Sequence, residues 1–393
     1  MRTKNLTGIL KVAALSLGLA ACTGTLGGDR VGGSAAPGTG STDGNVGGGA
    51  GNAGLARPMS AAECVGAPFD VGVTPLRRLT RDEYNNTASA LHGAVVAPAT
   101  DFLPDDQIGP FPSNSGIAVA EAQVDKYATA AEALATNSVK NLSTLVPCSK
   151  DGTVDAACAR QFVQSFGSRA FRRLLQSAEV DRYLALFDIG SAGGTSADGV
   201  WLVLLAFFQS PHFLYHVEQP SVSGVAKLSE QELAARISYF ITGGPPDAEL
   251  AQAAEAGLVS ADPRLHAKRL LTTPGARASI ERLHSYLLGV DRTEQLRKDA
   301  TTSPDFTPEV ALAMKTEAGR FAAHVVLEGD HTLRSLLTGS FSVLEPALAP
   351  VYGLSASESN GLVSLTNRSG ILTLPAVMAT YANANQTSPV KRG

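Results

Sequence analysis

His212, His216 and Glu218 form a group of neighbouring side chains of the types that bind metal ions. Two histidines four residues apart on a helix share one face and are able to hold one ion. Pro211 and the β-favouring Phe-Leu-Tyr run between the histidines argue against a regular helix. In an extended segment the same positions stand roughly 13 Å apart, which is too far for one metal. We therefore expect packed or hydrogen-bonded histidines and no metal site, and keep His212 as a candidate catalytic residue.

Glu317 is the second candidate for chemistry, because it lies close to an apolar stripe that includes Met314 and Phe321. A carboxyl group among apolar side chains has a raised pKa and is able to serve as a general acid. His324, one turn beyond Phe321, lies on the same side of the expected helix. The alternative interpretation is an edge residue paired with a nearby arginine.

Arg77, Arg78, Tyr84 and Asn85 are candidate binding residues, because together they offer a polar pocket for a sugar or an anion. The alternative is that they form hydrogen bonds between helices and hold the N-terminal part of the fold together. The sequence contains no Gly-x-Ser-x-Gly elbow, phosphate loop or dinucleotide fingerprint, so no familiar enzyme class is indicated. Whether the protein is an enzyme stays open.

These candidates must be positioned by helices, because nearly every periodic segment has helical spacing. Two capping boxes, Thr80 with Glu83 and Ser229 with Glu232, mark helix starts. Val200 to Phe208 is apolar on all sides and predicts a central buried helix. The sequence predicts an all-α fold with few strands, the best strand candidate being Phe213 to Tyr215. Further helices are expected over about 80–93, 117–142, 247–257, 276–289 and 307–329. One more helix is expected to end at Gly167, and others to begin at Ser177, at Pro263 and near Thr373.

The first 21 residues have the features of a secretory signal. Basic residues come first (Arg2, Lys4, Lys11), and a short apolar run ends at Leu19-Ala20-Ala21-Cys22. That run is shorter than the roughly 20 apolar residues needed to span a bilayer. The last four residues resemble the bacterial lipobox, which predicts cleavage before Cys22 and attachment of lipid to it. An ordinary signal peptide with a cysteine nearby is the alternative. We expect an exported protein whose N-terminal lipid holds it at the cell envelope, at the outer rather than the inner membrane.

A Gly-rich segment follows over residues 22–60, with 13 Gly among the 32 residues from 23 to 54. It has no apolar periodicity, so we expect a flexible tether with a reach of roughly 30 Å. Without the signal, the chain carries 29 basic and 36 acidic residues. This net charge of −7, with no basic stripe, gives no electrostatic case for nucleic acid.

Three cysteines remain after the predicted lipid site. Cys148 and Cys158 enclose nine residues, and an exported compartment permits a disulfide between them. Such a bridge stabilises the fold by about 2–3 kcal/mol. Cys64 is then left without a partner in the chain, whereas zinc binding is disfavoured by the spacing.

Four ordered motifs resemble those of a family of multi-domain proteins known from planctomycetes and myxobacteria, named after planctomycete cytochrome C proteins in which some of their modules occur. The resemblance covers about 75–393. The motifs are Leu76-Arg77-Arg78-Leu79-Thr80-Arg81-Asp82-Glu83-Tyr84-Asn85-Asn86-Thr87, Phe166-Gly167 with Arg169-Ala170-Phe171-Arg172-Arg173, Gln209-Ser210-Pro211-His212-Phe213-Leu214-Tyr215 and Ser388-Pro389-Val390-Lys391-Arg392-Gly393.

The resemblance implies helical modules over 74–145, 150–218 and 226–355 and the start of a truncated fourth at 365–393. The chain has no Cys-x-x-Cys-His for covalent haem, and His216 stands where relatives usually carry Arg. We therefore expect no cofactor, and any haem role belongs to a partner. The family has no settled activity. We expect an accessory protein to envelope redox or polymer-processing systems, with a cytochrome as a possible partner. The alternatives are a carbohydrate-binding (cellulose-like) protein and an unrecognised hydrolase or oxidoreductase.

Overall fold

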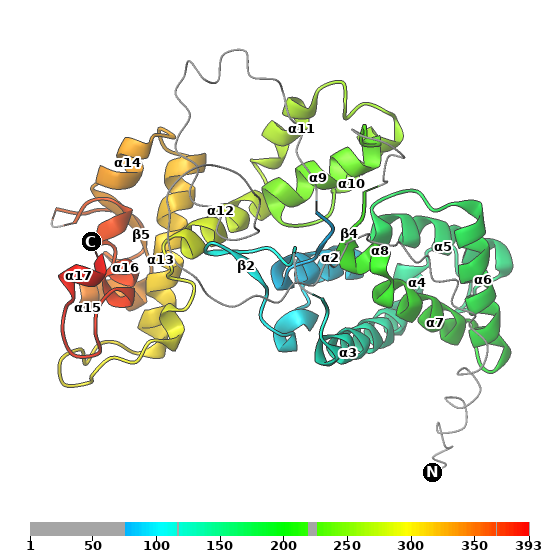
Figure 1. Ribbon diagram of the computed structural model, residues 1–393, viewed down its shortest axis with the longest axis horizontal. Coiled ribbons are helices and arrows are strands. Elements are labelled where there is room, and N and C mark those ends of the chain that lie inside the picture. The colour runs from blue at the N-terminus through cyan, green and yellow to red at the C-terminus, as the bar shows by residue number, and fades with distance from the viewer. Residues whose placement is uncertain (1–74, 116–117, 219–225, 367, 393) are drawn as a thin grey trace, which may run out of the picture. The chain divides into compact units, whose positions relative to one another are not determined.

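The computed structural model describes residues 75–115, 118–218, 226–366 and 368–392 (Figure 1). They belong to one compact unit, Asp70–Gly393. The signal sequence, Cys22, the Gly-rich segment and Cys64 lie outside the described residues, so what the sequence predicts for them stays a prediction. The described residues are mostly helical and their strands are short, which confirms the all-α expectation.

The N-terminal segment (residues 77–145) contains a long helix and three short strands, of which the second and third pair antiparallel with each other. The Thr80–Glu83 capping box forms as predicted at the start of its first helix. That helix ends before Gly93, whose left-handed φ of 75° is unstrained only for glycine. The elements are β1 (Arg77–Arg78), α2 (Arg81–His92), η2 (Pro98–Asp101), β2 (Gln107–Ile108), β3 (Phe111–Pro112), α3 (Glu121–Ser138), η3 (Val139–Asn141) and α4 (Leu142–Leu145).

The middle segment (residues 156–216) contains α5 (Ala156–Phe171), α6 (Ser177–Ala192), α7 (Ser196–Gln209), α8 (Pro211–Leu214) and β4 (Tyr215–His216). The prediction that Gly167 ends a helix is wrong, because α5 continues for four more residues. Gly167 is instead a packing position: a Cβ there would lie 2.6 Å from the Phe207 ring. Arg172, the residue after the last helical position, caps the helix in a left-handed conformation with a φ of 57°.

The predicted strand at Phe213–Tyr215 is mostly wrong. Ser210 accepts a hydrogen bond from the His212 N–H, and Pro211 is favourable in the first helical turn, so one turn of helix forms there. Only Tyr215 and His216 are extended. They pair antiparallel with β1, which joins the end of the middle segment to the start of the N-terminal segment.

The C-terminal segment (residues 230–392) begins with the second predicted capping box, between Ser229 and Glu232. Its strands β5 and β6 pair antiparallel. The elements are α9 (Glu230–Thr242), α10 (Ala248–Glu255), α11 (Pro263–Leu270), α12 (Pro274–Leu287), η4 (Thr293–Gln295), α13 (Pro308–Leu327), α14 (Leu333–Thr338), β5 (Phe341–Leu344), η5 (Pro346–Leu348), α15 (Ala349–Tyr352), β6 (Gly361–Ser364), η6 (Ile371–Thr373), α16 (Pro375–Thr380) and α17 (Pro389–Arg392).

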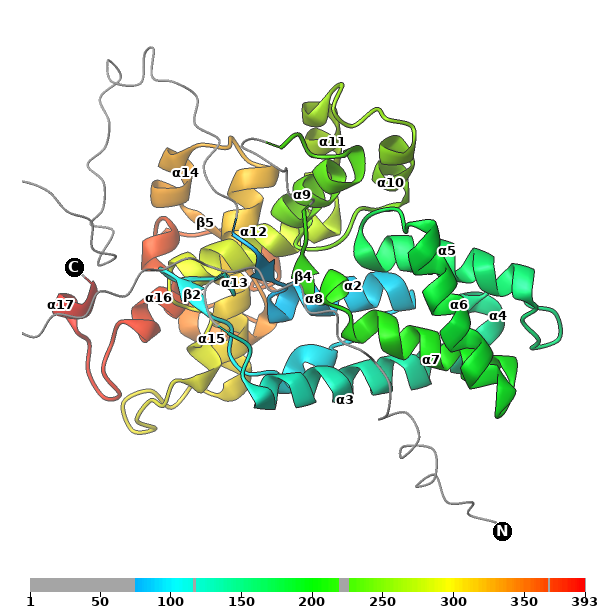
Figure 2. The same ribbon diagram turned by 45° about the vertical axis from the view of Figure 1, so that its right-hand side comes forward.

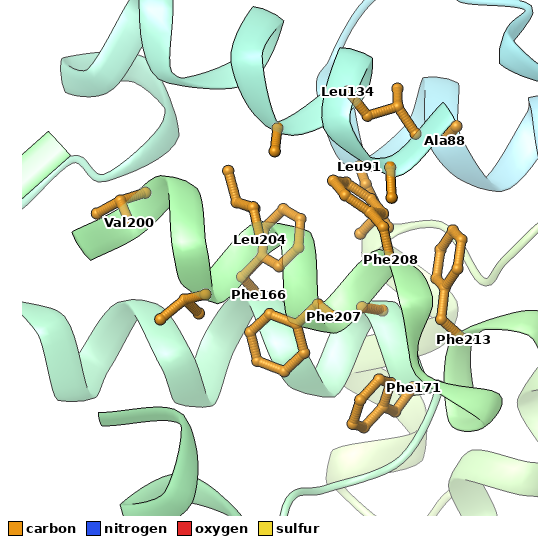
Figure 3. Packing of buried hydrophobic residues seen from close by; sticks show 14 of the residues in the cluster. Ala88, Leu91, Leu134, Phe166, Phe171, Val200, Leu204, Phe207, Phe208 and Phe213 are labelled. Atoms are coloured by element: carbon orange, nitrogen blue, oxygen red, sulfur yellow. The ribbon is translucent and has the colours of Figure 1, made fainter. Parts of the chain in front are cut away.

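The N-terminal and middle segments share one hydrophobic core. The predicted central helix is α7, which runs beside α3 in both views (Figures 1 and 2) and also packs on α5 and α6. Leu204, Phe207 and Phe208 project from α7 into a core that Phe166 and Phe213 complete (Figure 3). The C-terminal segment has two cores of its own, one over α9 to α11 and one around α13.

Among the described helices, none combines the length and the apolar character needed to cross a bilayer.

Candidate functional site

Glu83 is the centre of a buried ion cluster that links the N-terminal and middle segments. Both of its carboxylate oxygens accept hydrogen bonds of 2.8 Å from the Arg77 guanidinium, and the Thr80 N–H donates to it as well. His216 Nε2 lies 3.5 Å from the carboxylate. Burial alone would raise the pKa of Glu83, but the interactions with His216 and Arg77 outweigh burial and hold that pKa well below its usual range.

Tyr239 of α9 and Arg172 extend this contact to the C-terminal segment. The Tyr239 hydroxyl lies 2.6 Å from the Thr87 hydroxyl and accepts a hydrogen bond from Arg172. Arg172 also donates to the carbonyls of His212, Phe213 and Tyr215, and so closes the end of α8. Side chains from all three segments therefore meet in one hydrogen-bonded junction.

Three of the four predicted binding residues have partners within the protein apart from this junction. Arg78 donates to the Tyr127 hydroxyl at 3.2 Å, and Asn85 accepts from the Ala99 N–H at 2.8 Å. Tyr84 is 1% exposed and packs edge-on against two phenylalanine rings, whereas its buried hydroxyl has no hydrogen-bond partner among the described residues. With Arg77 bound to Glu83, these contacts support the interpretation that the four residues hold the fold together. Their role in binding a sugar or an anion stays a prediction.

His212 and His216 face different surroundings. The His212 ring lies 5.3 Å from the Phe171 ring, and its Nδ1 is buried without a hydrogen-bond partner among the described residues. Burial, followed by the positive charge of Arg173, lowers the pKa of His212. Glu218 is paired with Arg236 of α9. The described part of the chain holds no group of three or more residues that could bind a metal ion.

Glu317 is buried in the C-terminal segment, with 1% of its surface exposed. Its Oε1 accepts hydrogen bonds from Ser342, at 2.6 Å, and from the Tyr352 hydroxyl, whereas Oε2 has no partner among the described residues. Burial raises the pKa of Glu317 to about 7, although both hydroxyl hydrogen bonds act to lower it. The expected apolar surroundings are confirmed and the alternative of an arginine-paired edge residue is wrong. The carboxyl is buried away from solvent. A general-acid role for Glu317 stays a prediction.

A cleft of about 780 Å³ lies where the three segments meet, between α5 on one side and α9 and α10 on the other. This volume is in the range of small-molecule sites. The lining residues are Ala90, Leu91, Gln161, Gln164, Ser165, Ser168, Arg169, Arg172, Arg173, Leu174, Gln231, Ala234, Pro245, Pro246, Asp247, Ala248, Ala251, Ala254 and Glu255. None of the sequence-predicted site residues is among them.

The two walls of the cleft differ in chemistry. The α5 wall carries amide, hydroxyl and guanidinium groups at helical spacing, from Gln161 to Arg169. The α10 wall is formed mainly by small apolar side chains, such as Ala248 and Ala251, preceded by Pro245 and Pro246, with the carboxylates of Asp247 and Glu255 at its two ends. Sequence reasoning missed this site because the polar face of α5 has the spacing of an ordinary solvated face, and the opposite wall is about 90 residues away in the chain.

The predicted disulfide is formed. Cys148 and Cys158 are bonded, with their Cα atoms 5.6 Å apart, and the bridge links the chain after α4 to the first turn of α5.

Three family models match consecutive parts of the chain. Each is described as a protein of unknown function: DUF1587 matches residues 77–140, DUF1595 matches 158–218 and DUF1592 matches 228–354. Searches of curated proteins and of solved structures find no match to the chain.

Proposed function

Because the chain belongs to the proteins built from the planctomycete cytochrome-associated domains, which it carries in order along its length, we propose that it is an exported, lipid-anchored accessory protein of the cell envelope. In this role its helical body binds a ligand in the cleft between α5 and α10 and works with redox or polymer-processing partners. A haem protein is the partner class that the family association suggests, since this chain has no haem-attachment sequence of its own.

The cleft is the observation that carries the binding role. It is bounded by elements of all three segments, and the junction of Thr87, Arg172 and Tyr239 fixes those elements relative to one another. Preformed concave sites of this size are the usual places for ligand binding. The Cys148–Cys158 disulfide supports export, because such bonds persist in oxidising compartments.

The cleft favours an accessory role over the two alternatives. Its lining includes no aromatic side chain, whereas carbohydrate sites commonly use an aromatic face. Trp201, the single tryptophan, is partly buried and donates its indole N–H to Thr136. Glu317 and His212, the candidates for catalysis, lie outside the cleft lining.

Attachment of lipid to Cys22 is tested by expressing the full chain in a Gram-negative host fed with an alkyne-labelled fatty acid. We expect label on the wild-type protein, recovery in the outer-membrane fraction and loss of label in Cys22→Ser. Cys64→Ser is the matched control and should be labelled like wild type. Label that persists in Cys22→Ser, or none on wild type, would contradict the anchor.

The partner role is tested by cross-linking the wild-type lipoprotein in its native envelope and purifying it. We expect an envelope protein of redox or polymer-processing type in the complex, and haem absorbance if that protein is a cytochrome. Cross-linking that joins the protein to no envelope protein would overturn the accessory role.

A further inference from the structure

Two of the five charged residues that line the cleft are paired with an opposite charge within the protein. Arg173 makes two hydrogen bonds of 2.8 Å to Glu179, and Asp247 forms a similar pair with Arg269. Arg172 is occupied by backbone carbonyls and by Tyr239. Among the described residues no charged partner is found for Arg169, Arg172 or Glu255. Because the donors of Arg172 are taken by carbonyls and Tyr239, Arg169 is the lining cation with donors left for a ligand.

Arg169 has donors to spare. Its Nη2 donates to the carbonyl of Ala90, in the last turn of α2, at 2.8 Å. A guanidinium has five N–H donors in a planar fork that matches a carboxylate. The Arg169 side chain reaches solvent, although burial of part of it lowers its pKa, and no carboxylate of the described residues pairs with it. A negatively charged ligand group would supply the missing partner.

The remaining lining limits what carries that negative charge. The lining also offers apolar contact surface to the body of a ligand. This surface is formed by Leu91, Leu174 and the Ala and Pro side chains of the opposite wall. Glu255 opposes a second negative group by like-charge repulsion. A ligand that fits these features has one carboxylate near Arg169 and an apolar body against the α10 wall, while the uncharged amide and hydroxyl groups of α5 can stay hydrated.

We infer that the cleft binds a small apolar molecule bearing a single carboxylate, held by a two-point hydrogen bond to Arg169. This inference names the ligand class of the proposed function and rests on it. The competing interpretation gives Arg169 only a structural role, as a cap on the Ala90 carbonyl of α2. The two differ in whether Arg169 distinguishes a carboxylate from an uncharged group of the same size.

The test measures binding of octanoate and of octanamide to the full lipidated protein in phospholipid nanodiscs by calorimetry, with empty nanodiscs as background. We expect wild type to bind octanoate more tightly than octanamide. Arg169→Gln should weaken octanoate binding by about 10- to 100-fold, the range for a charge-assisted hydrogen bond. Octanamide binding should change little.

Arg160→Gln is the matched control, because Arg160 lies on the same helix, pairs with Asp181 and is not part of the lining. It should bind octanoate as wild type does. Ala251→Phe leaves Arg169 intact and fills the cleft from the α10 wall, so it should abolish binding of both probes. It also keeps the inference testable if Arg169→Gln fails to fold.

Equal affinity of wild type for octanoate and octanamide would overturn the inference. An equal loss of octanoate affinity in Arg169→Gln and Arg160→Gln would overturn it as well. No binding of octanoate to wild type at millimolar concentration would overturn it too. The proposed function fails separately, through the Cys22 label and the cross-linking readouts, so its failure is distinguishable from failure of the ligand assignment.

Discussion

Replacing Glu317 by Gln should remove a loss of stability that the C-terminal segment suffers as the pH rises. The carboxyl is 1% exposed and is bonded to the hydroxyls of Ser342 and Tyr352. Its pKa is about 7, against an ordinary value of 4.5, because burial penalises the ionised form. The folded protein therefore keeps a proton on Glu317 up to about neutral pH, whereas the unfolded chain loses that proton near pH 4.5.

The direction of the pH effect follows from this difference. Stability that depends on the protonated carboxyl is fully present below pH 4.5 and is lost as the pH rises through about 7. The full loss is about 3 kcal/mol, at 1.36 kcal/mol for each pH unit between the two pKa values. Arg368, whose guanidinium lies 5.1 Å from the centre of the Tyr352 ring, moderates the loss by favouring ionised Glu317. Glu281 of α12 is a partly buried carboxyl whose pKa is also raised by burial, so its ionisation likewise lowers the stability of the fold as the pH rises.

The assay follows unfolding in urea from pH 4.5 to 8.5 by far-ultraviolet circular dichroism, which reports on the helices of every segment. Glu317→Gln should resemble wild type at the acidic end and be more stable by up to about 3 kcal/mol above pH 7. Subtracting the two curves removes the contribution of Glu281. Glu309→Gln, an exposed change on the same helix, is the control and should parallel wild type. Parallel curves for wild type and Glu317→Gln at every pH would refute the reasoning.

Two further predictions concern packing and covalent links. Gly167→Ala should cost about 1–3 kcal/mol in urea unfolding, because its Cβ would meet the Phe207 ring at 2.6 Å. Gly193→Ala, with nothing within 4 Å, should be neutral, and equal effects of the two changes would contradict the packing argument. Replacing Cys148 and Cys158 by Ser should cost about 2–3 kcal/mol at any pH, and unchanged stability under oxidising conditions would contradict a stabilising bridge.

Local features of the fold were predictable from the sequence, because the interacting groups are near one another in the chain. Both capping boxes form, since each needs only a hydroxyl and a carboxyl three residues apart. The Cys148–Cys158 bridge likewise depends on a short loop. The apolar run of α7 predicted its central position because a helix without a polar face has to be covered on several sides.

The two errors have different causes, one a distant contact and the other a neighbouring cap. Gly167 has the sequence features of a helix stop, but the approach of Phe207 requires a residue without a side chain in the middle of α5. Phe213 and Leu214 favour a strand by type, but the Ser210 cap and Pro211 start a helical turn first.

The candidate site was beyond sequence reasoning because it too depends on contacts between residues distant in the chain. Thr87 and Tyr239 are 152 residues apart in the chain, and Asn86 donates to the carbonyl of Gly243 across 157. Arg169 was visible only as part of a family motif. Its place beside a cleft depends on where α9 and α10 pack, and no local pattern encodes that.

Binding of a ligand in the cleft between α5 and α10 is tested most directly on the full chain purified from its native host. The purified protein is denatured, and the small molecules released are measured by mass spectrometry for wild type and for Ala251→Phe. We expect wild type to release a carboxylic acid in near-stoichiometric amount and the filled-cleft variant Ala251→Phe to release none. Identical small-molecule profiles from the two proteins would contradict ligand binding in the cleft.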